Sequence, residues 1–236
     1  AVTTPDDPAA AATLERLRAH QAARNQRMVA ALDAHFRARL DAPGPGWDAV
    51  VDQTPLGNTT ERHIARAACE RLAALAVERG TEAEALFATL TGEAAQGDPA
   101  AQQNQLRSRL LKAGKPCYVD EDPDAYPSVA EVHALFCQLG AVPTYPVLGN
   151  PVTDGEADID ALCARLADWG IHSLELIASR NTADRVAAVC DAAAARGWPV
   201  VDGTEHNTAA MVPLLTELGT DPRFLPRLRE GACCLL

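Results

Sequence analysis

Apolar residues recur at helical spacing through the first half of the chain. Between positions 14 and 40, leucine, methionine, valine and phenylalanine side chains return every three or four residues, and a segment rich in proline and glycine then ends the pattern. A second helix is predicted from a cap at Thr59 or Thr60 to Gly80, because glycine readily adopts the left-handed conformation in which many helices end. Shorter helical segments follow, so residues 1–113 are predicted to form a helical subdomain.

After Gly114 the pattern becomes a repeat of helix, glycine and apolar strand, with the glycines at Gly140, Gly170 and Gly197. The strands are nearly continuous in apolar residues, which is typical of strands that are buried on both faces. A spacing of about 30 residues suits βα units. Residues 114–236 are therefore predicted to form the βα units of a parallel sheet or barrel, in an α/β protein. The predicted strands are 115–119, 141–148, 171–178 and 198–202.

Polar side chains gather directly after the last predicted strand, in the segment VVDGTEHNTAAM. In parallel α/β folds the functional residues lie at the carboxyl ends of the strands. Glu205 and His206 place a carboxylate beside an imidazole, a pair that can bind a metal ion or act as acid and base. The alternative is a polar loop in which Asn207 or Thr208 caps the following helix.

Glu175 is a lone acid within an apolar strand. A carboxyl group in that setting must be paired, protonated or bound to metal. Glu175 is therefore a candidate metal ligand, and the alternative is an acid at the strand edge that faces a helix arginine.

Composition narrows the classes of partner. The net charge is −11, with 21 basic residues against 32 acidic ones, so binding to a nucleic-acid backbone is not expected. No apolar run approaches the roughly 20 residues of a membrane span, and the N-terminal segment does not resemble a secretory signal. The seven cysteines are odd in number and include no C-x-x-C pair, which favours reduced thiols in a cytoplasmic protein.

The order of motifs resembles one known family. TERHIARAACERL, AGKPCYV, SVAEVHALFCQLGAVPTYP, GIHSLELI and DGTEHN follow one another as in the later part of PHP-domain (polymerase and histidinol phosphatase-like) phosphoesterases. The resemblance covers roughly residues 14 to 210 and rests on this order rather than on any one motif. It implies a partial or distorted (βα)7 TIM-like barrel with a helical insertion, and hydrolysis of a small phosphate ester by bound Zn, Mn or Fe.

The resemblance also implies roles for particular residues. Glu175, Glu205 and His206 are the candidate metal ligands, and the last two are also the acid–base candidates. Arg62 and His63 lie near a helix start, where free backbone N–H groups attract anions. The alternative for this pair is a solvated arginine and a half-buried histidine. The candidate substrate-binding residues are Arg62, His63, Lys115, Tyr118 and Tyr145.

The chain departs from the family in its metal motifs. The His-x-His strand and the Thr-Asp-His turn of the family are not present, and Tyr145 stands where the family has a metal-binding histidine. A phenol is a poor substitute for imidazole because it must first lose a proton of pKa near 10. Three explanations stay open: an incomplete chain, a rebuilt site, or a non-catalytic relative. The apolar ending favours an incomplete chain.

The rival function is a non-enzymatic binding or interaction module. A partial barrel leaves unpaired edge strands, so a partner chain or a homo-oligomer would have to cover them.

Overall fold

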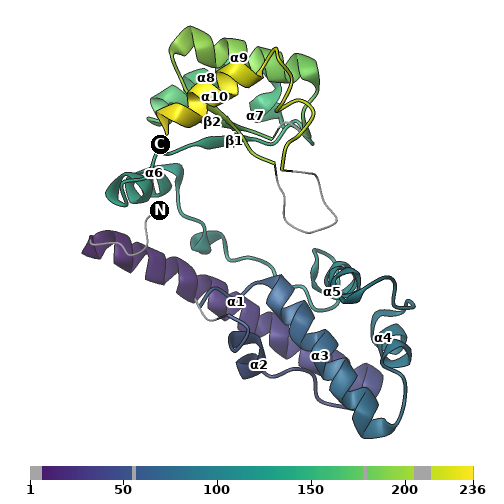
Figure 1. Ribbon diagram of the computed structural model, residues 1–236. Coiled ribbons are helices and arrows are strands. Elements are labelled where there is room, and N and C mark those ends of the chain that lie inside the picture. The colour runs from purple at the N-terminus through teal and green to yellow at the C-terminus, as the bar shows by residue number, and fades with distance from the viewer. Residues whose placement is uncertain (1–6, 55–56, 178–179, 205–213, 236) are drawn as a thin grey trace. The chain divides into compact units, whose positions relative to one another are not determined.

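The computed structural model describes residues 7–54, 57–177, 180–204 and 214–235. They form two compact units, one made of residues 12–126 and the other of residues 127–236 with the start of the chain (Figure 1). The division lies after Tyr126, whereas the sequence pattern changes at Gly114. In the part of the chain that is described, no helix is long and apolar enough to span a membrane.

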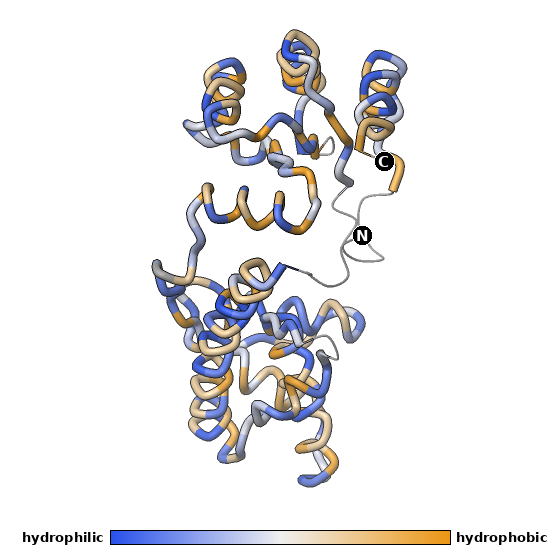
Figure 2. The backbone as a smooth tube through the Cα atoms, turned by 90° about the vertical axis from the view of Figure 1, so that its left-hand side faces the viewer, coloured by the Kyte–Doolittle hydropathy of each residue, from blue (hydrophilic) through white to orange (hydrophobic). Residues whose placement is uncertain are grey.

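The first unit is helical, and its core lies between two long helices. Hydrophobic and hydrophilic residues alternate along these helices, as expected for amphipathic segments (Figure 2). Met28, Leu32 and Phe36 are fully buried against Ile64 and Leu72. The helices are α1 (Pro8–Leu40), α2 (Trp47–Val51), α3 (Glu61–Arg79), α4 (Ala83–Thr91) and α5 (Pro99–Leu106), followed by a π-helical turn at Arg107–Leu111 and a 3-10 turn at Pro123–Ala125.

Residues 115–119 do not form the predicted strand. The amide of Lys115 bonds to the carbonyl of Lys112 at 2.9 Å, and the amide of Tyr118 bonds to the carbonyl of Lys115 at 3.1 Å, so the segment is a series of turns. The amide of Cys117 bonds to Leu110 at 2.9 Å, and its side chain is buried in the helical core. The apolar character of the segment reflects this burial among helices.

The second unit contains a small parallel sheet. Its strands are β1 (Tyr145–Val147), β2 (Leu174–Leu176) and β3 (Val200–Asp202), in the order β1-β2-β3. Tyr145 pairs with Leu174, which pairs with Val200. The helices are α6 (Val129–Gln138), α7 (Asp154–Ala157), α8 (Ile159–Asp168), α9 (Ala183–Arg196) and α10 (Leu225–Cys234).

The predicted (βα)7 TIM-like barrel is wrong. The described residues hold one sheet of three strands, each three residues long, which is too few for a barrel of seven βα units, even a distorted one. The repeats of helix, glycine and strand specify local βα units, but they do not specify how many strands a sheet will contain. The pattern left a parallel sheet or a barrel open, and the (βα)7 form came from the family resemblance.

The helices α8, α9 and α10 pack on one face of this sheet (Figure 1). Consecutive parallel strands joined by right-handed crossovers place their helices on the same side. Val147, Leu174, Leu176 and Val200 point into this helical layer and are at most 1% exposed. The intervening row, in which Pro146, Glu175 and Val201 are paired, points to the opposite face.

Both outer edges of the three strands are protected. On β3 the carbonyl of Pro199 and the amide of Gly203 bond to β2, so the polar groups of Val200 point outward, where α10 packs. Arg227 of α10 donates to the outward carbonyl of Trp198 at 2.7 Å. On β1 the outward position is Pro146, which has no N–H to offer an added strand.

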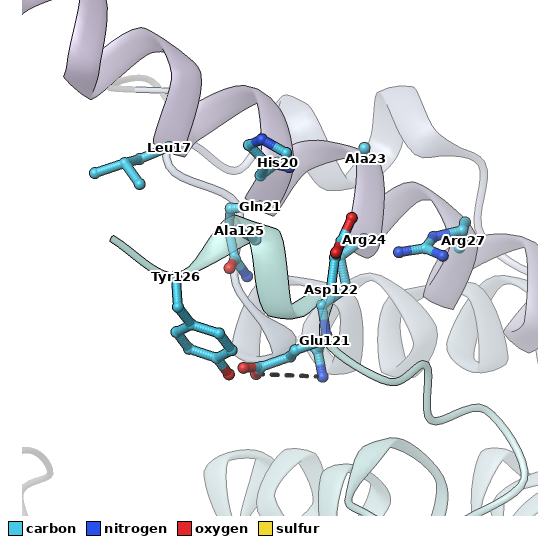
Figure 3. Close-up of a pocket in the computed structure, with 10 residues that line it drawn as sticks. All are labelled: Leu17, His20, Gln21, Ala23, Arg24, Arg27, Glu121, Asp122, Ala125 and Tyr126. Atoms are coloured by element: carbon cyan, nitrogen blue, oxygen red, sulfur yellow. Dashed lines mark ion pairs between the residues drawn. The ribbon is translucent and has the colours of Figure 1, made fainter. Parts of the chain in front are cut away.

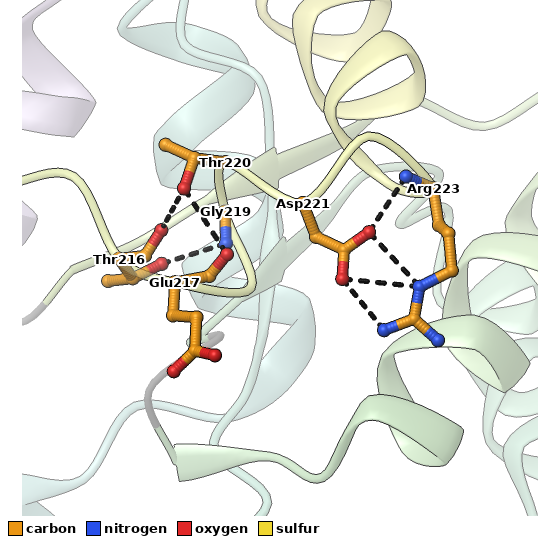
Figure 4. A network of polar contacts seen from close by, with 6 residues as sticks. All are labelled: Thr216, Glu217, Gly219, Thr220, Asp221 and Arg223. Atoms are coloured by element: carbon orange, nitrogen blue, oxygen red, sulfur yellow. Dashed lines mark hydrogen bonds and ion pairs between the residues drawn. The ribbon is translucent and has the colours of Figure 1, made fainter.

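A polar network fixes the turn between β3 and α10 (Figure 4). The Thr216 hydroxyl accepts from the amide of Gly219 at 2.9 Å and donates to the carboxylate of Asp202 at 3.4 Å. The Arg223 guanidinium donates hydrogen bonds to the Asp221 carboxylate, and the Nη2–Oδ2 distance is 2.7 Å. These contacts set where the chain enters α10 and so how that helix meets the edge of β3.

Candidate functional site

Arg24 is the centre of a polar pocket in the helical unit. It lies four residues before Met28 on α1, on the side of the helix that carries the core, and it is only 6% exposed. Its Nε donates to the carbonyl of Val119 at 3.0 Å, and its guanidinium lies over the Tyr118 ring, 5.4 Å from the ring centre. The core therefore holds the stem of this side chain, and the segment after α5 fixes its charged end.

The terminal nitrogens of Arg24 make no hydrogen bond with any of the described residues. Nη2 is 3.8 Å from a carboxylate oxygen of Glu61 and 3.7 Å from one of Glu121, distances too long for direct hydrogen bonds. Glu61 is itself held by the ammonium of Lys112 at 2.7 Å. Arg24 as a whole residue is buried, but its terminal nitrogens reach solvent, so their N–H donors can bind water or a ligand.

Two cavities meet at this arginine. One has a volume of about 260 Å³ and lies between α1 and the segment that carries the Pro123–Ala125 turn (Figure 3). The other has a volume of about 290 Å³ and lies at the start of α3. Both are lined by Gln21, Arg24 and Glu121. The first is also lined by Leu17, His20, Ala23, Arg27, Asp122, Ala125 and Tyr126, and the second by Thr60, Glu61, Arg62 and Arg107.

Two arginines of the second cavity have no carboxylate partner. Within the described residues, neither Arg62 nor Arg107 forms an ion pair, and the Nε of Arg107 is buried without a hydrogen-bond partner. Arg62 is exposed in the first turn of α3, where the backbone N–H groups at Glu61 and Arg62 precede the first intrahelical bonds. Guanidinium groups and a helix N-terminus together favour an anion in this cavity.

His63 forms part of the helix cap. Its Nδ1 accepts from the amide of Thr60 at 3.0 Å and lies 3.0 Å from the Thr60 hydroxyl. Burial, together with the nearby Arg66, lowers the pKa of the imidazole below its usual value, which favours the neutral form that this cap requires. His63 does not line either cavity, so the structure gives it a capping role at the edge of the site.

Neither Tyr118 nor Lys115 lines either of the two cavities. The Tyr118 ring lies against the Arg24 guanidinium, whereas Lys115 is exposed in the preceding turn. Of the proposed substrate-binding residues, Arg62 lines a cavity together with Arg24, and Tyr118 contacts Arg24 from outside the cavities.

Glu175 is the middle residue of β2 in the second unit. Its carboxylate lies against Gly203, the first residue after β3. A Cβ at position 203 would be 2.3 Å from the Glu175 Oε1. Glu175 is half-buried, and in the described part of the chain it has no hydrogen-bond or ion-pair partner. Oxygen ligands of this kind suit hard divalent cations.

Tyr145 does not join Glu175. Neighbouring positions on paired strands alternate between faces, and Glu175 pairs with Pro146, so the two side chains lie on opposite faces of the sheet. The Tyr145 hydroxyl donates to the buried Glu156 at 3.2 Å. Burial and this carboxylate raise the pKa of the phenol, which disfavours the phenolate that a metal ion would need. The two candidate residues Tyr145 and Glu175 therefore do not share a site.

Glu205 and His206 lie outside the described residues. They follow Gly203 in the sequence by two and three positions. Across residues 7–54, 57–177, 180–204 and 214–235, no three His, Cys, Asp or Glu side chains are grouped to hold a metal ion. Glu175 is thus the one proposed metal ligand whose surroundings are described.

Sequence reasoning did not find Arg24, Arg107 or Glu121. A signal for Arg24 was present, because the apolar stripe of Met28, Leu32 and Phe36 extends back to it at intervals of four. A charged residue on the core side of a helix requires a partner. Arg107 and Glu121 gave no comparable signal, since each lies in a polar stretch.

No family model, curated protein or solved structure matches this chain.

Proposed function

We propose that the chain is a metal-dependent phosphoesterase whose helical unit binds phosphate at Arg24. The observation that carries the proposal is Arg24, a buried residue whose guanidinium faces two cavities and whose terminal nitrogens make no hydrogen bond within the described part of the chain. Arg62 and Arg107 add two guanidinium groups that form no ion pair with any described residue.

Phosphate is the ligand that this arrangement suits. A guanidinium presents a planar pair of N–H donors that match two phosphate oxygens, and it stays charged at every physiological pH. Several such groups around one cavity neutralise the two negative charges of a monoester. Cavities of about 260 and 290 Å³ lie at the lower end of the range for small-molecule sites, so we infer a small ester.

The hydrolytic part of the proposal rests on Glu175 and on the order of motifs. A bound divalent ion would polarise the phosphoryl group and lower the pKa of a bound water. Glu175 supplies one carboxylate, which alone does not make a metal site, and Glu205 and His206 are the proposed further ligands. No step is assigned to Tyr145, because its hydroxyl is committed to Glu156 on the other face of the sheet.

Phosphatase assays on the purified chain test this proposal. The chain is stripped with chelator and offered p-nitrophenyl phosphate and a panel of small phosphate monoesters with Zn²⁺, Mn²⁺ or Fe²⁺. We expect metal-dependent release of phosphate. We also expect the affinity of the chain for inorganic phosphate to fall at least about tenfold in Arg62→Ala, because an arginine–phosphate contact contributes roughly 1.5–3 kcal/mol. Arg18→Ala, an exposed arginine of α1 outside both cavities, is the matched control. No turnover with any metal would reject the enzymatic reading.

A binding module without catalysis is the second candidate. The observation that favours it is Tyr145, which stands at the position of a metal-binding histidine and instead packs against the core and Glu156. Phosphate would then bind at Arg24 without turnover. Metal analysis of the purified chain separates the two functions, since stoichiometric Zn, Mn or Fe favours the enzyme. We do not extend this candidate to a partner chain at the sheet edges, because Pro146 and α10 protect them.

We also propose a cytoplasmic location. All seven cysteines are free thiols, and proteins of oxidising compartments commonly join theirs into disulfides.

A further inference from the structure

We propose that Glu121 is an internal competitor for the phosphate site, whose carboxylate stands against Arg24 where an anionic ligand would bind. The inference rests on the proposed binding of phosphate at Arg24. It concerns what sets the strength of that binding, which the resemblance to phosphoesterases does not address.

The geometry around Arg24 is that of a weakly held pair. Two carboxylates approach Nη2 at 3.7 and 3.8 Å, so they neutralise the guanidinium without forming the short bidentate bonds that arginine makes with a fitted anion. A phosphate oxygen that reached hydrogen-bond distance would gain contacts that neither carboxylate makes.

Of the two carboxylates, Glu121 is the one that can move away from Arg24. Glu61 is held by Lys112 at 2.7 Å, and its side chain is only 20% exposed. Glu121 has a side chain that is 40% exposed, and it lies in the extended segment between Val119 and the Pro123–Ala125 turn. Within the described residues, its one polar contact is the pair with Arg24, which is drawn in Figure 3.

The Arg24–Glu121 pair also stands between the two cavities. Both residues line the 260 Å³ cavity and the 290 Å³ cavity, so the pair forms their shared wall. When Glu121 turns outward, the cavities join and the Arg24 guanidinium faces the combined space. Four arginines and three carboxylates line that space, and removal of the Glu121 charge leaves the balance clearly positive.

The test compares the affinity of the full chain for inorganic phosphate by titration calorimetry at low ionic strength. Glu121→Gln keeps the shape of the side chain and removes its charge. We expect it to tighten binding by about fivefold or more, the factor that repulsion between two unit charges about 4 Å apart gives even at the dielectric constant of water. Asp120→Asn is the matched control, because this neighbouring residue is exposed and lines neither cavity.

The outcomes separate this inference from the proposed function. Tighter binding in Glu121→Gln alone, lost again when Arg62→Ala is added, supports the competitor. Equal binding by the natural chain and Glu121→Gln, or an equal gain in Asp120→Asn, overturns it and leaves the phosphate site standing. Absence of phosphate binding in both chains overturns the inference together with the binding half of the proposed function. Turnover of phosphate esters without tighter phosphate binding in Glu121→Gln overturns this inference and leaves the proposed function standing.

Discussion

Gly231 of α10 lies against the backbone of Val200 so closely that a Cβ at position 231 would be 2.0 Å from the Val200 carbonyl oxygen. Val200 is the residue of β3 whose polar groups point away from the sheet. The absence of a side chain at position 231 is therefore what lets a helix cover the edge of a parallel strand.

Gly231→Ala should destabilise the second unit. Alanine normally stabilises a helix relative to glycine by up to about 1 kcal/mol, but here its methyl group would meet backbone that cannot yield, and overpacking costs roughly 1–3 kcal/mol or more. We expect a lower midpoint in urea unfolding. Gly155→Ala is the matched control, because a Cβ there would be no closer than 3.8 Å to any neighbour. An unchanged midpoint in Gly231→Ala would contradict the close packing of α10 on β3.

Arg24 should contribute to stability as well as to binding. Arg24→Met keeps most of the buried stem, but it leaves the Val119 carbonyl without its donor and removes the cation from the Tyr118 ring. We expect a loss of about 2–3 kcal/mol in the free energy of unfolding, the usual cost of breaking a partly buried charged hydrogen bond. The measurement is urea denaturation followed by circular dichroism.

The control for this variant lies one turn along the same helix. Arg27 lines the first cavity but is exposed and forms no ion pair in the described residues. Arg27→Met should change the free energy of unfolding by no more than about 0.5 kcal/mol. Equal losses in the two variants would mean that Arg24 has no special anchoring role.

The buried thiols of Cys117, Cys163 and Cys190 and the half-buried thiol of Cys69 should resist modification. Burial raises the pKa of both Cys69 and Cys117 to about 11, and it also raises the pKa of Cys163 and Cys190. A higher pKa leaves less thiolate at neutral pH, and thiolate is the reactive form. With iodoacetamide at pH 8, we expect labelling at the exposed thiols of Cys137, Cys233 and Cys234, and labelling of the other four only after unfolding. Mass spectrometry of tryptic peptides shows which cysteines are labelled before unfolding and which only after it.

The sequence pattern could predict most of the local structure, but little of how distant segments of the chain pack together. The Ser128 capping box forms as its spacing indicates, with the amide of Ser128 bonded to Glu131 at 2.8 Å. Gly140, Gly170 and Gly197 adopt the left-handed conformation that ends each helix ahead of a strand. These features depend on neighbouring residues, which a local pattern records directly.

The pattern could not predict contacts between distant segments. Residues 115–119 are apolar enough for a strand, but they pack among helices, and only the tertiary fold decides between these outcomes. The Arg24 pocket joins residues 95 positions apart through the hydrogen bond to Val119, so its membership is not visible in any one motif. Tyr145 and Glu175 are both candidate site residues, but a one-residue difference in strand register places them on opposite faces of the sheet.

The role of Glu175 can be tested by a substitution that keeps its shape. Glu175→Gln removes the charge that a divalent cation needs, so we expect the affinity for metal to fall at least about tenfold. The metal content of the purified chain, measured by inductively coupled plasma mass spectrometry, should fall with it. The unfolding free energy should change by no more than about 0.5–1 kcal/mol, because the carboxylate has no partner to lose in the described residues.

Glu156→Gln is the contrasting variant. This buried carboxylate accepts the Tyr145 hydroxyl on the helical face, so its substitution should lower stability and leave metal content unchanged. If Glu175→Gln unfolds the second unit as readily as Glu156→Gln and binds metal as the natural chain does, then Glu175 is a structural acid and the metal proposal loses its one described ligand.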